Sequence, residues 1–503
     1  MKLTTKIVVS SLFAFGLSSA TVNFPFPQNV SYGNGIEVSN KTAAATQLKS
    51  AFSYYLTDKY KESEDGNYAA IEKDPNNYVS EGIGYGMLMM VYFSDNTTSY
   101  QSQFDKLWAY YKAGENEHGL MNWAFGTLTP YNNKANAATD AEMDVAAALI
   151  MAAYQFGDNK YLDDAKALLK NVKQYEFEEN GLHKPGDAWN DKKNPSYIAP
   201  AYYRLFAAVD TDNATFWNTT AMDANYALLE TNSAQYSTGL FDNWSNSSGI
   251  GLDNYYGYDA ARTPWRLAQD FYWFGETKAK TMLSKLGAWV STYAASAMNG
   301  TIERSGSPMW NDHNSTFVAT LMTSLVTDAS HQAKLDEYWN EVTTLGNEAY
   351  FEQSMKILCG LLVSGNMPNL TNMNGTKPSS NSSQQGGSSG STQPSSSGSQ
   401  GTNQQPSGTN PTNPNDPGTP DDPSAITAVH NATGFLFAGN TISVSLKGMS
   451  KVDLLDLQGR TVSTLWNGNA NGNVALSVKA KPGLYLVRIQ GAGIHETHKV
   501  AVK

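Results

Sequence analysis

The sequence predicts an all-α fold for most of its length, an (α/α)6 barrel, followed by a flexible linker and a small C-terminal β-sandwich. Helical segments that are apolar nearly all round alternate with segments that carry charge on one face. A helix that is apolar on every side is buried, whereas a one-sided helix lies at the surface. The linker is expected from a long run of small polar residues, and the sandwich from short strands that alternate by two.

Twelve helices are expected in the larger part of the chain. Even-numbered members, such as 144–154, are apolar, and odd-numbered members, such as 160–170, are amphipathic. Six buried and six outer helices describe two concentric rings, whereas an open helical solenoid would show a repeat of fixed period, which we do not find. The expected helices are 42–60, 81–93, 98–112, 140–156, 160–175, 199–209, 213–231, 262–274, 276–296, 314–327, 330–345 and 351–364.

The composition divides the chain into four parts. Residues 1–20 carry Lys2 and Lys6, an apolar run and Ser-Ser-Ala, the layout of a secretory signal peptide cleaved after Ala20. A membrane anchor would need a longer apolar run. Residues 21–375 form the helical unit, and the Gly/Ser/Asn/Pro-rich residues 376–424 cannot offset the entropy of ordering, so they form the linker. We therefore expect a secreted or cell-surface protein with no membrane-spanning segment.

The fourth part, residues 425–503, predicts the β-sandwich. Strands are expected at 441–446, 452–457 and 483–489. Turns are expected at Gly459, Gly468, Gly472 and Pro482-Gly483.

Charge and scattered reactive residues exclude several classes of function. The net charge of −11 disfavours a nucleic-acid or anionic-membrane partner. Cys359 is the single cysteine, so no internal disulfide can form, and its apolar surroundings predict a core thiol. The histidines lack the spacing of metal ligands, and His313 is expected to form hydrogen bonds. We expect no metal, no cofactor and a monomer.

Unusual polar motifs occur where the even-numbered helices begin. Because the inner helices of such a barrel run parallel, these motifs are expected to meet at one end. Taken singly, Glu81, Thr139, Asp140 and Asp312 could cap helices, and Asp259 could merely pair with Arg262. The motifs are Ser80-Glu-Gly82, Ala138-Thr-Asp-Ala-Glu-Met-Asp144, Asn194-Pro-Ser-Tyr197, Tyr258-Asp-Ala-Ala-Arg262 and Asn311-Asp-His-Asn314.

The acidic residues among them suit the hydrolysis of a glycosidic bond. That reaction needs one carboxyl to protonate the leaving oxygen and another to activate water or attack the sugar. The candidates are Glu81, Asp140 and Asp259. A helix N-terminus favours carboxylate, so a protonated acid needs burial or a nearby negative charge, which Asp140 could supply to Glu81. A stacking cleft, or simply core packing, would use the nearby rings of Trp123, Trp189, Tyr197, Trp244 and Tyr258.

At these motifs the chain resembles glycoside hydrolase family 8, in particular its bacterial endoglucanases. The resemblance covers nearly the whole helical unit and implies an (α/α)6 barrel and an inverting mechanism. It is carried by Phe24-Pro-Phe-Pro-Gln28, Ser80-Glu-Gly-Ile-Gly-Tyr-Gly-Met87, Phe104-Asp-Lys-Leu-Trp108, Lys184-Pro-Gly-Asp-Ala-Trp189, Asn194-Pro-Ser-Tyr-Ile-Ala-Pro-Ala-Tyr-Tyr203, Tyr258-Asp-Ala-Ala-Arg262 and Leu361-Leu-Val-Ser-Gly-Asn366.

The resemblance also implies roles for single residues. Glu81 matches the general acid, Asp259 the general base, and Asp140 the aspartate that orients the sugar at the cleavage point. The expected substrate contacts are Trp123, Trp189, Tyr197, Tyr258 and Arg262, the last matching the arginine beside the base. The chain departs from the family pattern at Glu142, Val145 and Asp242-Asn-Trp244, where Asp, Ile or Met, and Pro-Asp-Trp are usual.

These matches predict a secreted, metal-independent endo-β-1,4-glucanase whose partner is a β-linked polysaccharide. An endo-xylanase or mixed-linkage β-glucanase is the alternative within the enzyme class, and a non-catalytic polysaccharide-binding protein is the alternative from another class. The C-terminal part resembles type IX secretion sorting domains at Val452-Asp-Leu-Leu-Asp-Leu-Gln-Gly-Arg460 and Gly483-Leu-Tyr-Leu-Val-Arg488, which implies contact with secretion machinery. A carbohydrate-binding module is the rival interpretation there, with Trp466 and Tyr485 as its candidate rings.

Overall fold

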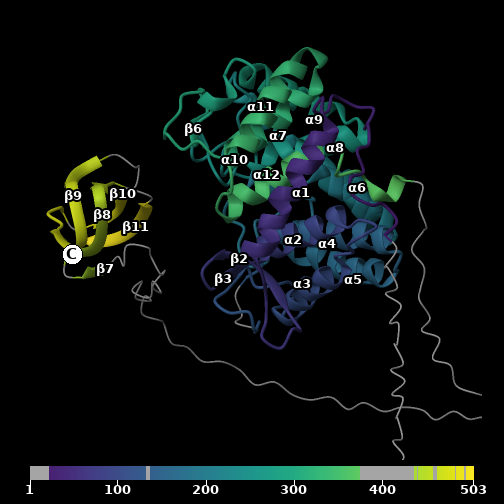
Figure 1. The fold of residues 1–503 in the computed structure, drawn as a ribbon, viewed down its shortest axis with the longest axis horizontal. Coiled ribbons are helices and arrows are strands. Elements are labelled where there is room, and N and C mark those ends of the chain that lie inside the picture. The colour runs from purple at the N-terminus through teal and green to yellow at the C-terminus, as the bar shows by residue number, and fades with distance from the viewer. Residues whose placement is uncertain are drawn as a thin grey trace, which may run out of the picture. The chain divides into compact units, whose positions relative to one another are not determined.

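The computed structural model describes residues 22–131, 136–373, 436–438, 440–456, 461–481, 483–491 and 494–502. The chain divides into two compact units, one within residues 1–388 and one within 389–503 (Figure 1). The predicted signal peptide, the linker and the start of the C-terminal part lie outside the described residues, so those assignments stay predictions.

The first unit contains twelve α-helices within its described residues, at the places where the sequence predicts them. Two of the predicted α-helices are shorter than expected: 276–296 ends at Val290, and 330–345 begins at Gln332 after a 3-10 helix, Ala329–His331. Two others change character along their length. Residues 213–231 correspond to a π-helix, Phe216–Ala221, that leads into α7, and residues 314–327 to α10 followed by the 3-10 helix Thr323–Thr327 (η5). The helices are α1 Lys41–Asp58, α2 Ser80–Phe93, α3 Gln101–Ala113, α4 Thr139–Phe156, α5 Lys160–Glu176, α6 Pro200–Val209, α7 Met222–Ala234, α8 Arg262–Phe274, α9 Thr277–Val290, α10 Ser315–Met322, α11 Gln332–Thr344 and α12 Tyr350–Val363.

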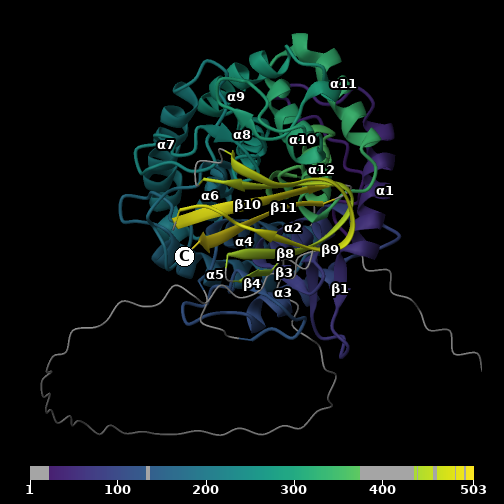
Figure 2. The same ribbon diagram turned by 90° about the vertical axis from the view of Figure 1, so that its left-hand side faces the viewer.

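Burial alternates along this series as the apolar pattern predicts. Every residue of α2 except Glu81 is buried, whereas α5 buries only one stripe. Each even-numbered helix contacts the next, from α2 through α12, and α12 also contacts α2. Each odd-numbered helix packs against an even-numbered neighbour, and Figure 2 shows the odd-numbered helices toward the periphery. None of the helices in the described part of the chain is both long and apolar enough to cross a membrane.

Short strands, which the sequence did not predict, lie before two of the buried helices. The strands β1 Tyr60–Glu62, β2 Ala69–Asp74, β3 Asn77–Val79 and β4 Ala124–Phe125 form an antiparallel sheet in that order. The end of β3 leads directly into α2, and β4 follows Trp123. Before α8, β5 Tyr255–Tyr256 pairs with β6 Ile302–Glu303. These strands fix the chain just before Glu81 and just before Asp259.

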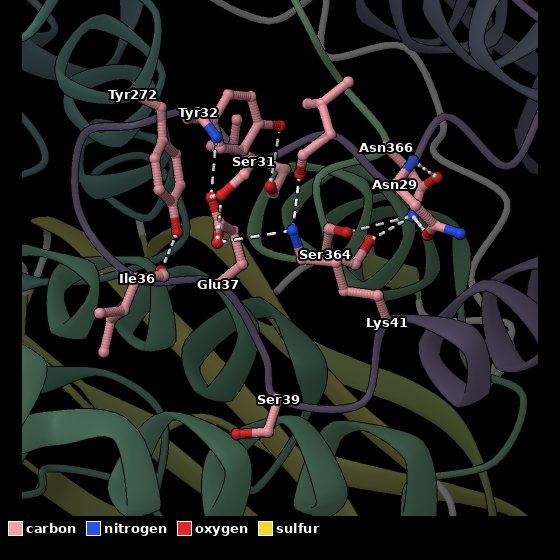
Figure 3. A network of polar contacts seen from close by, with 12 residues as sticks. Asn29, Ser31, Tyr32, Ile36, Glu37, Ser39, Lys41, Tyr272, Ser364 and Asn366 are labelled. Atoms are coloured by element: carbon pink, nitrogen blue, oxygen red, sulfur yellow. Dashed lines mark hydrogen bonds and ion pairs between the residues drawn. The ribbon is translucent and has the colours of Figure 1, made fainter.

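The segment before α1 lies across the C-terminal ends of buried helices. Its backbone bonds to Gln155 at the end of α4, to Ser94 after α2 and to Val363 at the end of α12. Figure 3 shows the part of this network around Tyr32, whose ring stacks on Tyr272 of α8 at 4.3 Å. This segment therefore ties together the helix ends opposite those where the polar motifs begin.

The C-terminal unit contains five antiparallel strands in its described residues. They form one sheet in which β8 pairs with β7, β9 and β10, and β10 pairs with β11. Alternate residues of β8, including Ile442, Val444 and Leu446, are buried, as the alternation by two predicts. The packing of two sheets that defines a sandwich stays a prediction. The strands are β7 Leu436–Ala438, β8 Thr441–Leu455, β9 Thr461–Ser477, β10 Gly483–Gly491 and β11 Ile494–Val502.

Two expectations for this unit are wrong. The strands predicted at 441–446 and 452–457 are one continuous strand, β8, because β9 pairs with it from residue 441 to residue 455. Gly468 and Gly472, which were expected in turns, lie inside β9 for the same reason. Trp466 is partly buried against the core of the unit, and its indole N–H donates to the carbonyl of Gly468 at 3.2 Å.

Candidate active site

Residues from four of the five polar motifs at the starts of the buried helices line one cavity of about 390 Å³. Glu81 is the second residue of α2, Asp140 the second of α4, and Arg262 the first of α8. Asp259 lies in the turn before α8. The predicted convergence is therefore observed for these four motifs, whereas residues 311–314 do not line the cavity. The cavity is lined by Lys73, Val79, Ser80, Glu81, Trp123, Ala138, Asp140, Tyr197, Tyr258, Asp259, Arg262, Tyr350 and Phe351.

Close packing of α2 on α4 brings two of the carboxyl groups to the same place. Gly84 of α2 lies where a Cβ atom would come within 2.7 Å of the Asp144 Cβ and 3.3 Å of the Ala141 carbonyl oxygen. Only glycine allows the two helices to approach so closely at this point. Their first turns, which carry Glu81 and Asp140, are thereby held side by side.

Arg262 joins these two carboxyl groups. Its Nη1 lies 2.6 Å from the Glu81 Oε2 and also donates to the Asp140 Oδ2. Its Nε donates to the Ser196 hydroxyl at 3.2 Å, and its guanidinium lies over the Tyr197 ring at 5.0 Å. One fixed positive charge therefore faces two carboxyl groups, so the cluster carries a net negative charge when both are ionised.

Asp140 is buried, and only one of its oxygens is satisfied. Burial raises its pKa to about 7, and the nearby Glu81 adds to that rise while Arg262 opposes it. Its Oδ1 has no hydrogen-bond partner among the described residues. An unpaired buried acceptor costs free energy, which a hydroxyl group of a bound ligand would recover.

Asp259 is exposed on the turn that precedes α8. Its Oδ2 accepts a hydrogen bond of 2.9 Å from the Trp244 indole N–H. The simple interpretations of Glu81 and Asp259 do not hold in the described structure. Arg262 pairs with Glu81 and Asp140 and not with Asp259, and the carboxyl of Glu81 forms no cap of α2.

The tenth-helix motif supports one wall of the cavity. Asp312 accepts a bond of 2.7 Å from the Tyr258 hydroxyl, and Asn314 donates to the same hydroxyl at 2.9 Å while it caps α10. His313 contacts the Met298 carbonyl and the Glu341 carboxylate through its two ring nitrogens, as expected for a hydrogen-bonding residue.

The predicted aromatic residues differ in how they face the cavity. Trp123, Tyr197 and Tyr258 line it, and Trp123 is 48% exposed. Trp189 does not line it, and instead packs on Trp244 with ring centroids 5.6 Å apart. The ring centroids of Trp244 and Tyr197 are 6.4 Å apart, so the three rings form a continuous row that begins at the cavity wall.

Tyr350 and Phe351 also line the cavity, although the sequence analysis did not select them. The Tyr350 hydroxyl donates to the Glu81 Oε1 at 2.9 Å, so both Glu81 oxygens have donors. These residues begin α12, the last even-numbered helix. The rule that selected the other motifs would have found them if it had been applied to aromatic as well as acidic residues.

Behind Asp140 lies a second, fully buried group of carboxyls. Glu142, one of the departures from the family pattern, accepts from the Tyr111 hydroxyl at 3.2 Å. Burial raises the pKa of Glu142 and of Glu176. The negative charge of Asp140 raises both pKa values further, and that of Glu142 also raises the pKa of Glu176. Across the described residues, no three His, Cys, Asp or Glu side chains are arranged to hold a metal ion. Cys359 is buried, and burial raises its pKa, which agrees with a core thiol.

Comparison with known proteins agrees with this geometry. Residues 37–365 match the profile of Glycosyl hydrolases family 8. The chain is 32% identical to Endoglucanase 2 of Ruminiclostridium josui over 74% of its length and 84% of that protein. It is 30% identical to Endoglucanase A of Acetivibrio thermocellus over 73% of its length and 80% of that protein. In fold it is similar to the apo β-1,3-1,4-glucanase of Paenibacillus sp. X4, with a TM-score of 0.64 and 24% identity over 68% of this chain and 98% of that one.

Proposed function

Because the chain belongs to glycoside hydrolase family 8, we propose that it is an endo-β-1,4-glucanase that cuts internal linkages of cellulose-type polysaccharides. Hydrolysis with inversion is characteristic of this family. The observation that carries the proposal is that Glu81, Asp140 and Asp259 line one cavity together with aromatic rings. A protein that only binds polysaccharide needs the rings but has no use for an acid and a base.

In the proposed mechanism, Asp259 activates the water and Glu81 protonates the departing oxygen. The exposed position of Asp259 suits a group that must receive water from the solvent. Inverting enzymes hold their two carboxyls about 6.5–9.5 Å apart, which leaves room for that water. Arg262 and Tyr350 both donate to the Glu81 carboxyl, so the leaving oxygen approaches a group that is already held in place.

Asp140 is proposed to orient the sugar at the cleavage point. Its unpaired, buried Oδ1 supports this role, because a sugar hydroxyl could donate to it. Asp140 shares the single positive charge of Arg262 with Glu81, so its position is fixed relative to the proposed acid. Trp123, Tyr197 and Tyr258 are proposed to contact the sugar rings, with Trp189 farther along the same wall.

The wider architecture is proposed on the same basis. We infer a closed (α/α)6 barrel, which the contacts from α2 round to α12 and back to α2 support. We further propose a secreted or cell-surface monomer made of a signal peptide at 1–20, a catalytic domain at 21–375, a linker at 376–424 and a sorting-type β-sandwich at 425–503. The position of Trp466 against the core of the C-terminal unit supports a sorting role over carbohydrate binding.

The activity is tested by a reducing-sugar assay on carboxymethyl cellulose, xylan, mixed-linkage glucan and chitosan. We expect the highest rate on carboxymethyl cellulose, with a rapid fall in viscosity because the cuts are internal. Preference for xylan or for mixed-linkage glucan would replace the proposed substrate. Binding without release of reducing ends from any polymer would favour a non-catalytic polysaccharide-binding protein.

The C-terminal role is tested by fusing residues 425–503 to a fluorescent reporter. We expect the fusion to remain in solution with insoluble cellulose. Retention on cellulose that is lost in a Trp466→Ala variant would replace the sorting role with that of a binding module.

A further inference from the structure

Asp259 is held by a turn and not by a helix. The turn spans residues 258–261, between β5 and the first residue of α8, and the Asp259 side chain is exposed. A general base must be fixed within about half an ångström of its working position, and a short exposed turn cannot achieve this by its own packing. Contacts from elsewhere in the chain must therefore supply the rigidity.

Asn243 supplies two of these contacts. Its Oδ1 accepts the backbone N–H of Gly257 at 2.9 Å and that of Ala260 at 3.0 Å, which lie on either side of Tyr258-Asp259. The Asn243 side chain is buried, and a Cβ atom on Gly257 would lie 2.9 Å from its Nδ2. The turn backbone is thus packed directly onto the amide group.

The neighbours of Asn243 are themselves anchored. The backbone N–H of Asp242 donates to Asn232 of α7 at 3.0 Å, and its carboxylate pairs with the buried Arg304 at 2.9 Å. On the other side, the Trp244 indole donates to the Asp259 carboxylate. Asn243 therefore connects the turn to a part of the helical unit that is itself held by a hydrogen bond and a buried ion pair.

We propose that Asn243 is a positioning residue for Asp259: its amide oxygen fixes the backbone on both sides of the base, while the adjoining Trp244 orients the carboxylate. The inference rests on the proposed role of Asp259 as general base. Asn243 itself does not line the cavity, so it acts through the turn and not through contact with the sugar.

The neutral amide also limits the negative charge around the base. Asp253 and Tyr255 from the preceding segment and Tyr197 from the helical turn before α6 all interact electrostatically with Asp259. Lys192 brings a positive charge to this region: it interacts with Asp253, and its Nζ lies 3.8 Å from the Trp244 ring centre. Asn243 therefore holds the turn without adding a charge of its own beside Asp259.

The first test compares Asn243→Ala with Asn225→Ala. Asn225 is a matched control because it is equally buried and also bonds to backbone groups, those of Gly181, His183 and Ala221, away from the cavity. We expect N243A to lower kcat by about 10- to 100-fold, the usual loss from a misplaced catalytic group, with KM changed much less. N225A should lose stability but keep kcat. Equal kcat values for N243A and the wild type would overturn the proposal.

Two further variants separate positioning from general destabilisation. N243D keeps an oxygen acceptor for both backbone N–H groups, so at its optimum pH it should recover kcat to within a few-fold of the wild type. In a D259N background N243A should cost nothing more, because its effect passes through Asp259. An N243D enzyme as slow as N243A at every pH, or additive losses in the double variant, would contradict the inference. A fully active D259N enzyme would overturn the proposed function itself.

Discussion

Arg262 is the residue at which the charges of the site meet. Its guanidinium contacts Glu81 and Asp140 at once, and it stacks on Tyr197. One cation therefore faces two carboxyl groups in the cavity. The proposed division of labour follows from position, since Asp259 faces the solvent that supplies water while Glu81 and Asp140 lie at adjoining helix ends.

Replacing either proposed proton-transfer group should remove most of the activity without unfolding the enzyme. We expect Glu81→Gln and Asp259→Asn each to lower kcat by about two to four orders of magnitude, the usual contribution of one positioned acid or base. Rates on carboxymethyl cellulose and circular dichroism spectra check this. The exposed Glu117 is a control, and Glu117→Gln should keep the wild-type rate. A loss of less than tenfold for either site variant would remove that residue from the proposed pair.

Glu176 should make stability depend on pH. It is fully buried, and within the described part of the chain neither carboxyl oxygen has a partner at hydrogen-bond geometry. Burial first, then Glu142, raises its pKa. Its folded-state pKa therefore lies above the unfolded value of about 4.3, and the native state binds more protons between the two. Stability contributed by the protonated form is complete below the unfolded pKa and is lost as pH rises toward the folded pKa.

Glu176→Gln removes this titration. We expect the melting temperature of the variant, measured from pH 5 to pH 8, to exceed that of the wild type by a margin that grows with pH. The exposed Glu179 provides a matched control, since Glu179→Gln should give a curve parallel to the wild type. A parallel curve for Glu176→Gln would mean that the group does not titrate as its surroundings indicate.

At the scale of elements, a buried ion pair joins α4 to α8. Both oxygens of Asp144 accept from Arg266, at 2.6 and 2.7 Å, and both side chains are fully buried. Since Asp140 and Arg262 lie one helical turn earlier on the same two helices, the pair also fixes the spacing of the site.

Breaking this pair should be costly. Asp144→Asn leaves the Arg266 charge buried without its counter-ion, and we expect it to lower the free energy of unfolding by about 3–5 kcal/mol. Urea denaturation measures the effect. The exposed pair of Lys278 and Glu230 is the comparison, because Glu230→Gln should cost less than about 1 kcal/mol. Similar losses for the two variants would show that the α4–α8 pair is not a special constraint.

The helices and strands also show how far the sequence predicts this structure. The twelve helices follow from apolar periodicity, because most residues of each even-numbered helix are apolar, and most are buried. Strands β4 and β5 have two residues each, too few to show any alternation. β8 is continuous because it pairs with β9 along its whole length. The polar residues in the middle of β8 give no sign of this pairing in the sequence.

The residues of the site also divide into those that the sequence predicts and those that it does not. Glu81, Asp140, Asp259 and Arg262 were predictable because topology alone brings the starts of inner helices together. The bond from Trp244 to Asp259 and the bond from Tyr350 to Glu81 were not predictable, since each joins segments whose spacing is set only by tertiary packing. Trp189 matches the family motif, yet its ring packs on Trp244 and does not line the cavity.

At the scale of the whole molecule, the helical unit should be sufficient for catalysis. All the residues that line the cavity lie between residues 73 and 351. The segment before α1, which bonds to the ends of α2, α4 and α12, begins within the described residues at Val22. A fragment of residues 21–375 therefore contains both the site and the segment that joins the opposite helix ends.

We expect this fragment to fold alone and to keep the rate of the full chain on soluble polymer. Circular dichroism and the rate on carboxymethyl cellulose, compared with the full chain, check the prediction. A second fragment that starts at residue 42 lacks the joining segment and should melt at a lower temperature. An unfolded or inactive 21–375 fragment would contradict the division into two independent units.

The central claim is that Asp259 activates a water molecule while Glu81 protonates the leaving oxygen on the other side of the bond. Water then attacks the face of the sugar opposite the departing group, so the configuration at the anomeric carbon is inverted. Proton NMR of the first product released, recorded before mutarotation, reports that configuration directly. The account predicts that a β-linked substrate first gives the α-anomer. An initial β-anomer would mean retention, and would contradict the proposed acid and base.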